Sequence, residues 1–518
     1  MTRTEQFAAL DSTFDVLIVG GGATGLGIAV DSATRGYRTA LVEAGDFAQA
    51  TSSRATKLVH GGVRYLASGQ IHLVYEALHE RKVMITNAPH LVHPLAFITP
   101  AYKWQDLPFY GSGLKLYDLL SGSASLGKTR ILSAKETRQL QPGIATTGMK
   151  GSILYYDGQF DDARLALAIA RTAQDHGALV CNYTRCVRLT KQQGKVDGAV
   201  VKDMESGQEI NVKAQTVINA AGIYSDEIRH QDNASLPDLL TTSRGTHIVV
   251  PGIVLGSPNA IMVPKTKDGR IIFAIPWLGQ VVIGTTDLPA PGVELEPGHL
   301  ASEIDFLIET INPYLAQPIS RRDVLSVFSG LRPLVTGKAG TTSKLSREHH
   351  IDRSLSGLIT VAGGKWTTYR RMAQDTLDFA VRHRMLESRK CSTATLKLHG
   401  APANAAPNGL FARYGTDAPA LQAIVDADPA AATLLDQQLP YSVAEVIYAV
   451  RQEMARTVED VLSRRTRALL LNARAAQRAA APVASIMAKI LGYDVGWIEQ
   501  QVRSFHLLAE SFYVATPE

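Results

Sequence analysis

A short apolar run near the start of the chain, residues 16–30, is interrupted by five glycines and constrains the fold more than any other segment. Residues 16–19 are apolar and mostly β-branched, which is typical of a buried parallel strand, whereas residues 26–35 have helical spacing. The GGGATG between them matches G-x-G-x-x-G, in which the three glycines allow a tight turn, a close approach of pyrophosphate and helix–strand packing. Gly20, Gly22 and Gly25 are therefore predicted to bind the phosphates of a dinucleotide at a helix N-terminus.

A second predicted strand, TALVE, ends at Glu43, which lies 18 residues after Gly25. An acid in this place accepts hydrogen bonds from a ribose hydroxyl in dinucleotide-binding folds. The order of strand, helix, second strand and terminal acid favours a dinucleotide site. The alternative is a glycine-rich turn between strand and helix that binds no ligand.

The nucleotide-binding pattern is interrupted after Glu43, where a loop of small polar residues begins. It resumes at residues 214–226, an apolar strand with a glycine-containing turn, and at residues 358–380, which comprise a strand, two glycines and an amphipathic helix. A sheet split by long insertions suits a large cofactor that lies extended across the domain. We therefore expect FAD rather than NAD, bound by a split Rossmann-like domain of the α/β class.

The bulk properties of the chain limit the remaining possibilities. A length of 518 residues is too great for one compact core and indicates two or more domains. A net charge of +5 is too weak to indicate nucleic-acid binding but is compatible with anionic substrates or a lipid surface. The three cysteines have no metal-binding or redox spacing, so we expect a reducing compartment and no metal site. The N-terminus lacks a secretory apolar segment, and no apolar run is long enough to predict a transmembrane helix.

The chain is predicted to divide into an oxidoreductase region, residues 1–391, and a helical C-terminal domain, residues 392–518. An antiparallel meander over residues 260–287, with Asp268 and Gly269 in a hairpin turn, indicates an inserted antiparallel-sheet substrate domain. In the C-terminal part the longest helical segment is expected over residues 442–479, where Ser442 and Glu445 form a capping box. The FAD-binding segments are expected at residues 14–62, 150–232 and 352–388, and the substrate-domain segments at residues 63–149 and 233–351.

Seven motifs in order between about residues 14 and 371 resemble the FAD-dependent, quinone-linked (aerobic) glycerol-3-phosphate dehydrogenases. The resemblance implies bound FAD, oxidation of sn-glycerol 3-phosphate to dihydroxyacetone phosphate and electron transfer to a membrane quinone. The alternative is an FAD-dependent glycerol-3-phosphate or amine/2-hydroxy-acid oxidase that uses oxygen; the short spacing between SGLRPL and GGKWTTYR favours the dehydrogenase. The motifs are GGGATG, TSSRATKLVHGGVRYL, DDARL, GTHIVVP, IGTTD, SGLRPL and GGKWTTYR.

Hydride transfer from a secondary alcohol requires a proton acceptor and an anchor for the substrate phosphate. By the resemblance, the phosphate is expected to be bound by Arg64, Arg332 and Arg347, with Tyr65 adding a hydroxyl, because arginine binds phosphate bidentately. Either His247, at the head of a predicted apolar strand, or Lys365 is expected to be the base, and the sequence does not choose between them. Arg54 is expected to be a surface residue.

The same resemblance assigns the remaining cofactor contacts. Val187 is expected beside the adenine. Thr51, Ser52, Ser53, Lys57, Leu58 and His60 are expected at the flavin end. The other cofactor contacts implied by the resemblance are Gly222, Asp287, Gly364, Lys365, Thr367 and Thr368.

Reduction of a quinone also requires contact with a lipid bilayer surface. Residues 102–128 contain aromatic side chains interspersed with leucines and lysines, a pattern that suits a helix lying in a membrane surface. A helix that packs between domains is the alternative. The expected location is cytoplasmic, peripheral on the inner face of the cytoplasmic membrane, and a homodimer is one assembly compatible with the resemblance.

Overall fold

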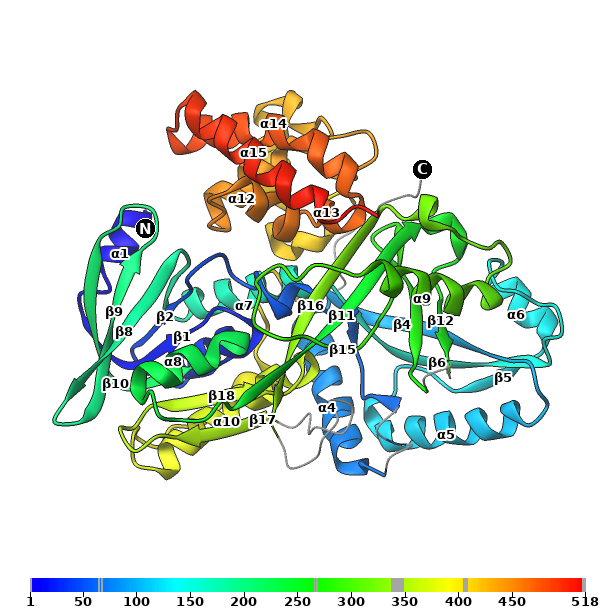
Figure 1. Cartoon of the computed structure of the whole chain (residues 1–518), viewed down its shortest axis with the longest axis horizontal. Coiled ribbons are helices and arrows are strands. Elements are labelled where there is room, and N and C mark those ends of the chain that lie inside the picture. The colour runs from blue at the N-terminus through cyan, green and yellow to red at the C-terminus, as the bar shows by residue number, and fades with distance from the viewer. Residues whose placement is uncertain are drawn as a thin grey trace.

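The computed structural model contains two β-sheets and a separate group of C-terminal helices (Figure 1). The first sheet carries the N-terminal glycine turn, and the second sheet lies beside it. The structure describes residues 2–63, 66, 69–264, 266, 269–336, 349–403 and 409–514.

The first sheet has the split Rossmann-like arrangement expected from the sequence. Its strand order is β17-β18-β10-β1-β2-β7, and β1 lies parallel to both β10 and β2. Helix α2 packs between α10 and α7 in the main hydrophobic core of this region. Antiparallel strands β8 and β9 extend the sheet from β10, and the short helices α1 and α8 also belong to this part. The bounds are β1 Thr13–Val19, α2 Ala23–Thr34, β2 Thr39–Val42, α7 Asp162–Asp175, β7 Leu179–Cys181, β8 Thr184–Gln192, β9 Lys195–Asp203, β10 Glu209–Asn219, β17 His349–Arg353, β18 Ile359–Gly363, α10 Tyr369–Arg382, α1 Arg3–Ala8 and α8 Ser225–Asp232.

The second sheet is mostly antiparallel, and it contains the predicted meander as β12, β13 and β14. Of the expected hairpin turn, Gly269 has a positive φ of 79°, and Asp268 lies outside the described residues. The strand order is β15-β11-β14-β13-β12-β4-β6-β3, with β16 paired to β11 and β5 paired to β6. The bounds are β3 Leu58–Val59, α4 Ile71–Asn87, β4 Val92–Ala101, α5 Asp106–Ser121, β5 Arg130–Leu132, α6 Ala134–Leu140, β6 Gly151–Phe160, β11 Leu240–Pro251, β12 Ala260–Val263, β13 Ile272–Trp277, β14 Gln280–Gly284, β15 Leu288–Pro289, α9 Ala301–Ile311 and β16 Ser326–Val335.

Two features of the second sheet differ from the expectation. Strand β6 lies in this sheet although residues 151–160 were expected in the FAD-binding part, because it pairs with β4 along its whole length. His247 lies inside β11 rather than at the head of a strand, since β11 begins at Leu240 and pairs with both β14 and β16 there.

The C-terminal domain is helical, as expected, and packs on the second sheet through Val249, Trp277 and Phe328. Ser442 precedes α12, and its backbone N–H donates to the Glu445 carboxylate at 2.8 Å. The helical segment expected over residues 442–479 is broken, because Met454 and Arg467 adopt left-handed conformations with φ values of 56° and 64°. The helices are α11 Ala418–Ala427, α12 Val443–Gln452, α13 Ala468–Leu471, α14 Ala473–Leu491 and α15 Val495–Glu510.

Candidate cofactor and substrate site

The turn between β1 and α2 has the geometry that the G-x-G-x-x-G motif predicts. Gly20 has a φ of 114°, and a Cβ on Gly25 would lie 1.9 Å from the Gly20 carbonyl oxygen. The backbone conformation at Gly20 and the close approach at Gly25 therefore leave no room for any other residue at these two positions. Gly22 is the N-cap of α2, and an added Cβ there would have only Ser52 Oγ within 4 Å, at 3.1 Å, among the described residues. The helix N-terminus thus has the open side that a pyrophosphate needs.

Glu43 lies at the end of β2, beside this turn. Its carboxylate accepts hydrogen bonds from the backbone N–H of Gly21 at 2.6 Å and of Gly45 at 2.9 Å, and burial raises its pKa. The backbone N–H of Thr184, at the start of β8, donates to the Glu43 carbonyl at 2.7 Å. Val187 follows three residues later on β8 and is 37% exposed. Strand β8 thus begins beside Glu43, and the adenine contact of Val187 stays a prediction.

Residues 44–57, which we call the cofactor loop, direct some side chains toward β16 and the start of α2 and bury others on the opposite side. Thr51 Oγ1 donates to the Leu331 carbonyl of β16 at 2.7 Å, whereas Ser52 Oγ accepts the N–H of Ala23, at the start of α2, at 3.0 Å. Ser53 and Lys57 are fully buried, and neither lines the two cavities described below. Lys57 Nζ lies 2.6 Å from Asp162, and burial lowers its pKa to about 7.

Two other turns follow parallel strands of the first sheet. After β18, Gly364 has a φ of 78°, and a Cβ there would lie 2.4 Å from Met372 Sδ. Thr367 Oγ1 donates to the His60 carbonyl at 3.4 Å, and Thr368 Oγ1 donates to the Lys365 carbonyl at 3.3 Å. After β10, Gly222 has a φ of 58°, and an added Cβ would meet nothing within 4 Å in the described parts of the chain. Ligands in open α/β sheets bind at such carboxyl ends of parallel strands.

Two adjoining cavities lie where these turns meet the second sheet. Both are lined by Thr56, Leu58, His60 and Arg332. One continues along Asp287 and aromatic residues of the second sheet; the other contains Thr51, Arg54, His247, Gly364, Lys365 and Thr367. The structure therefore brings both predicted bases and one predicted phosphate ligand to a single place.

His247 is buried, and its ring stacks on Phe328 with centroids 4.7 Å apart. Its Nε2 lies 3.0 Å from Thr56 Oγ1, and its Nδ1 is buried without a hydrogen-bond partner among the described residues. Burial, followed by the charges of Arg332 and Lys57, holds the pKa of His247 well below 6.5. The imidazole is therefore neutral at physiological pH.

Arg332 is held by an ion pair and several hydrogen bonds. Its Nη1 lies 3.2 Å from the Asp287 carboxylate, and its Nη2 donates to Thr285 Oγ1 at 3.2 Å. A Cβ on Gly245 would lie 2.1 Å from Nη2, so the neighbouring strand leaves room for the guanidinium by having a glycine. Asp287, predicted to bind the cofactor, thus lies directly against the predicted phosphate ligand.

Arg54 corrects the expectation of a surface residue. It is buried, pairs with Glu296 at 2.6 Å, and its Nε and Nη1 have no hydrogen-bond partner in the described parts of the chain. The sequence did contain a sign that Arg54 is not a surface residue, because it lies inside the long motif TSSRATKLVHGGVRYL. Asp162, in the motif DDARL, was also missed, although it is fully buried against Lys57 and Arg467. The predicted ligands Arg64, Tyr65 and Arg347 lie outside the described residues.

The open side of Gly22, the N-terminus of α2 and the buried Glu43 carboxylate together fit the phosphates and ribose of FAD. A model of FAD-dependent oxidoreductases matches residues 15–370, and a model of the C-terminal domain of alpha-glycerophosphate oxidase matches residues 358–496. The mitochondrial glycerol-3-phosphate dehydrogenase of Macaca fascicularis is 41% identical over 95% of this chain and 73% of its own.

The chain belongs to the FAD-dependent glycerol-3-phosphate dehydrogenase family. The mitochondrial glycerol-3-phosphate dehydrogenase of Arabidopsis thaliana is 38% identical over 98% of this chain and 87% of its own. A solved glycerol-3-phosphate dehydrogenase from Bacillus halodurans, complexed with FAD, is similar over 100% of this chain and 99% of its own, with a TM-score of 0.81 and 28% identity. The predicted fold, the enzyme class and FAD as the cofactor of the family are confirmed.

Two further features depend on the chemistry of the side chains: a metal site and a membrane-spanning helix. No group of three or more His, Cys, Asp or Glu side chains is placed to hold a metal ion in the described parts of the chain. Within the same ranges, no helix has both the length and the apolar character needed to cross a bilayer.

Proposed function

We propose that this member of the family oxidises sn-glycerol 3-phosphate to dihydroxyacetone phosphate and passes the electrons to a membrane quinone. FAD, held at the turns around Gly22, Gly222 and Gly364, would supply the acceptor for the hydride. One observation carries the proposal: a neutral, buried His247 and an oriented Arg332 border one pair of adjoining cavities beside the FAD-binding turns. A secondary alcohol with a remote phosphate needs both kinds of group at once.

In this proposal Arg332 binds the substrate phosphate. The ion pair with Asp287 and the hydrogen bond that Arg332 donates to Thr285 fix the plane of the guanidinium before the substrate arrives. Arginine remains charged at all physiological pH values and binds a phosphate through two parallel N–H groups. The binding energy of the phosphate then places the carbon that is oxidised.

His247 is the proposed proton acceptor for the substrate hydroxyl. Its low pKa keeps the ring neutral, and its Nε2 lies beside Thr56, which lines both cavities. A neutral imidazole nitrogen is a competent base, whereas an imidazolium is not. Lys365 lines the cavity that contains His247 and remains the second candidate.

Anaerobic reduction of the FAD-loaded protein tests the substrate assignment. We expect sn-glycerol 3-phosphate to bleach the flavin absorbance, and glycerol, lactate and glycine to leave it unchanged. Bleaching by glycine or lactate, with no response to sn-glycerol 3-phosphate, would overturn the proposal.

Oxygen is the acceptor in a second candidate function, which the match to the C-terminal domain of alpha-glycerophosphate oxidase favours. An oxidase would turn over with oxygen alone and release hydrogen peroxide at the rate of substrate consumption. A dehydrogenase is expected to produce little peroxide and to need a quinone analogue or a dye. Measurement of peroxide in air-saturated buffer separates the two.

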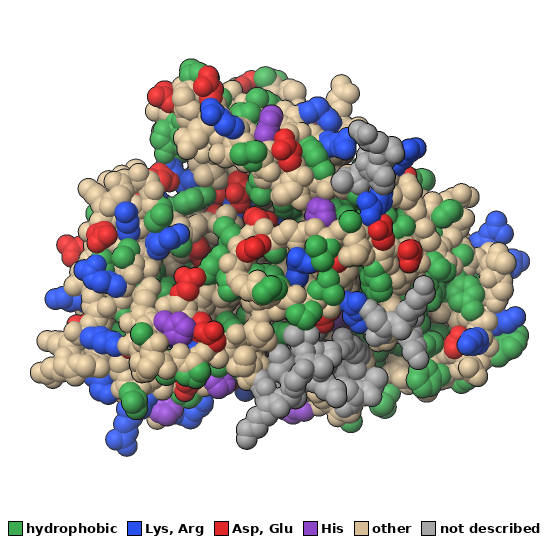
Figure 2. All heavy atoms as spheres, viewed as in Figure 1, with side chains coloured by type: hydrophobic (Ala, Val, Ile, Leu, Met, Phe, Trp, Pro, Cys, Tyr) green, Lys and Arg blue, Asp and Glu red, His purple; other side chains and the backbone are tan. Residues whose placement is uncertain are grey.

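For quinone reduction we propose that α5 and the residues next to it rest on the lipid surface. Trp104, Phe109 and Leu119 are 71%, 72% and 76% exposed, and Lys103 and Lys115 are exposed on the same segment. Figure 1 places α5 at the lower edge of the molecule, opposite the C-terminal helices, and Figure 2 shows hydrophobic side chains in that region. Exposed aromatic side chains with flanking lysines fit the interface of an anionic bilayer.

Co-sedimentation with vesicles of phosphatidylcholine and phosphatidylglycerol tests this surface. The triple variant Trp104→Ser/Phe109→Ser/Leu119→Ser is expected to lose most vesicle binding and most quinone reduction in vesicles, but to keep dye-linked activity. The matched control is Ile253→Ser/Leu355→Ser, since these apolar residues are 84% and 95% exposed elsewhere. Binding of the triple variant at the wild-type level would contradict the proposal.

The location on the inner face of the cytoplasmic membrane and the homodimer are parts of the same proposal. Fractionation of the source cells and light scattering of the purified protein test them.

A further inference from the structure

We infer that the helical C-terminal domain positions the cofactor loop, residues 44–57, and thereby sets the affinity for FAD. Three arginines of one C-terminal segment, residues 459–467, reach this loop through buried ion pairs and hydrogen bonds. The inference rests on the FAD site of the family and not on the proposed substrate.

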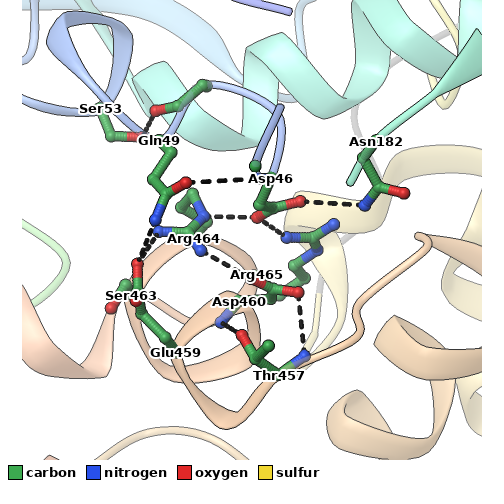
Figure 3. A network of polar contacts seen from close by, with 12 residues as sticks. Asp46, Gln49, Ser53, Asn182, Thr457, Glu459, Asp460, Ser463, Arg464 and Arg465 are labelled. Carbon is green, nitrogen blue, oxygen red and sulfur yellow. Dashed lines mark hydrogen bonds and ion pairs between the residues drawn. The ribbon is translucent and has the colours of Figure 1, made fainter. Parts of the chain in front are cut away.

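The first connection joins the loop to Arg464 and Arg465. Both guanidinium groups donate to the carboxylate of Asp46, and all three side chains are at most 1% exposed (Figure 3). Arg464 also pairs with Glu459 and Asp460, each at 2.7 Å. Gln49, in the same loop, donates to Glu459 at 3.0 Å. The beginning of the loop therefore depends on the C-terminal segment for its charge balance.

The second connection lies at the end of the loop. Arg467 Nη2 donates to the Ser53 carbonyl at 3.0 Å and lies 2.8 Å from Asp162. Lys57 Nζ donates to the same carbonyl at 3.0 Å and to Asp162 at 2.6 Å. Two basic side chains from different domains thus share one carbonyl and one carboxylate, which fixes the backbone at Ser53.

The opposite side of the loop forms part of the FAD site. Ser52 Oγ accepts the first N–H of α2, and the Ala48 N–H donates to the Gly21 carbonyl at 3.0 Å. Thr56 lies beside His247. A shift of the loop would therefore move groups at the pyrophosphate turn and at the proposed base together.

The physical reason for this arrangement is the cost of a buried charge. Asp46 is 0% exposed, and without the two arginines its carboxylate would keep, among the described residues, only the weak contact with Asn182 at 3.4 Å. An unpaired buried carboxylate is strongly unfavourable, so the loop cannot keep this conformation unless the C-terminal segment is docked.

The variant Asp46→Asn tests the inference, because it removes the charge and keeps the size of the side chain. We expect its dissociation constant for FAD to rise by about tenfold or more, which corresponds to a loss of about 1.4 kcal/mol. The temperature at which flavin fluorescence appears on heating the holoenzyme should fall further than the far-UV circular dichroism midpoint, a split that a general loss of stability would not produce.

The control is Asp417→Asn, which removes a carboxylate from another ion pair between the domains, Arg171–Asp417, without touching the cofactor loop. It should lower the unfolding midpoint and leave the FAD dissociation constant unchanged. If Asp46→Asn fails to fold, Gln49→Ala replaces it, with an expected rise in the FAD dissociation constant of about threefold. The inference is overturned if the folded loop variant keeps wild-type FAD affinity, or if Asp417→Asn weakens FAD binding as much.

Discussion

The guanidinium of Arg332 lies 3.2 Å from the carboxylate of Asp287. Arg332 lies on β16, and Asp287 follows the end of β14. The pair borders the cavity next to the FAD-binding turns. The guanidinium also donates to Thr285 Oγ1 and to the Thr286 carbonyl, each at 3.2 Å, so its orientation is fixed on more than one side. We propose that a substrate phosphate binds beside this oriented positive charge.

Replacement of Arg332 by Ala should raise the KM for sn-glycerol 3-phosphate on the order of a hundredfold, because a charge-assisted bidentate contact is lost. FAD content, read from the ratio of flavin to protein absorbance, should stay at the wild-type level. Arg322→Ala, which removes an exposed arginine, is the control and should leave KM unchanged. A wild-type KM for Arg332→Ala would show that the phosphate binds elsewhere.

The variant His247→Asn should lower kcat by roughly a hundredfold or more, since general base catalysis contributes about that much. The pKa of His247 lies well below 6.5, so the neutral base persists as the pH falls through 6.5. The acid limb of kcat/KM in the wild-type enzyme should accordingly lie below pH 6.5. An unchanged pH profile in His247→Asn, with loss of the limb in Lys365→Met, would assign the base to Lys365.

Two glycines of the first turn should respond differently to alanine. Gly22→Ala should fold normally, because the new Cβ meets only Ser52 Oγ at 3.1 Å, but FAD binding should weaken by about tenfold or more as the pyrophosphate loses its space. Gly25→Ala should fail to fold or lose FAD entirely, since its Cβ would lie 1.9 Å from a backbone oxygen. Soluble expression, circular dichroism and flavin content measure both results. If the two variants showed the same folding and the same flavin content, the proposed difference between Gly22 and Gly25 would be wrong.

His399 links two carboxylates, with Nδ1 2.6 Å from Asp175 of α7 and Nε2 3.0 Å from Asp417 of the C-terminal region. Burial lowers the pKa of His399, but the hydrogen bonds to Asp417 and Asp175 outweigh it, so the pKa is raised above 6.5. The folded protein thus holds a proton that the unfolded chain loses at about pH 6.5. The resulting stabilisation is complete below pH 6.5 and disappears as the pH rises through the folded pKa.

We therefore expect His399→Gln to lower the unfolding temperature by roughly 1–3 °C at pH 6 and by less at pH 9. Differential scanning calorimetry at the two pH values measures the difference. An equal loss at both pH values would mean that His399 acts through packing rather than through its charge.

Several elements of the fold and site could be predicted from the sequence because they depend on local backbone geometry. The glycines of the first turn show this: Gly20 needs a positive φ, and Gly25 has no room for a side chain. The β1 run, the acid at the end of β2 and the meander of β12 to β14 were predicted for the same reason, since strand and turn preferences act between neighbours in the chain.

Long-range contacts decided the rest. Arg54 resembles a surface residue in the sequence, yet it is buried against Glu296, more than two hundred residues later. The helical pattern over residues 442–479 is interrupted near Arg467, whose guanidinium is committed to Ser53 and Asp162 in the other domain.

The sequence by itself thus determined the FAD-binding turn, the class of fold and the family, because these follow from spacing along the chain. Only the tertiary structure decided which charges meet: Asp287 with Arg332, and Asp46 with Arg464 and Arg465. The physical reason is that a buried ion pair depends on how distant segments pack and exclude water, which no local pattern specifies.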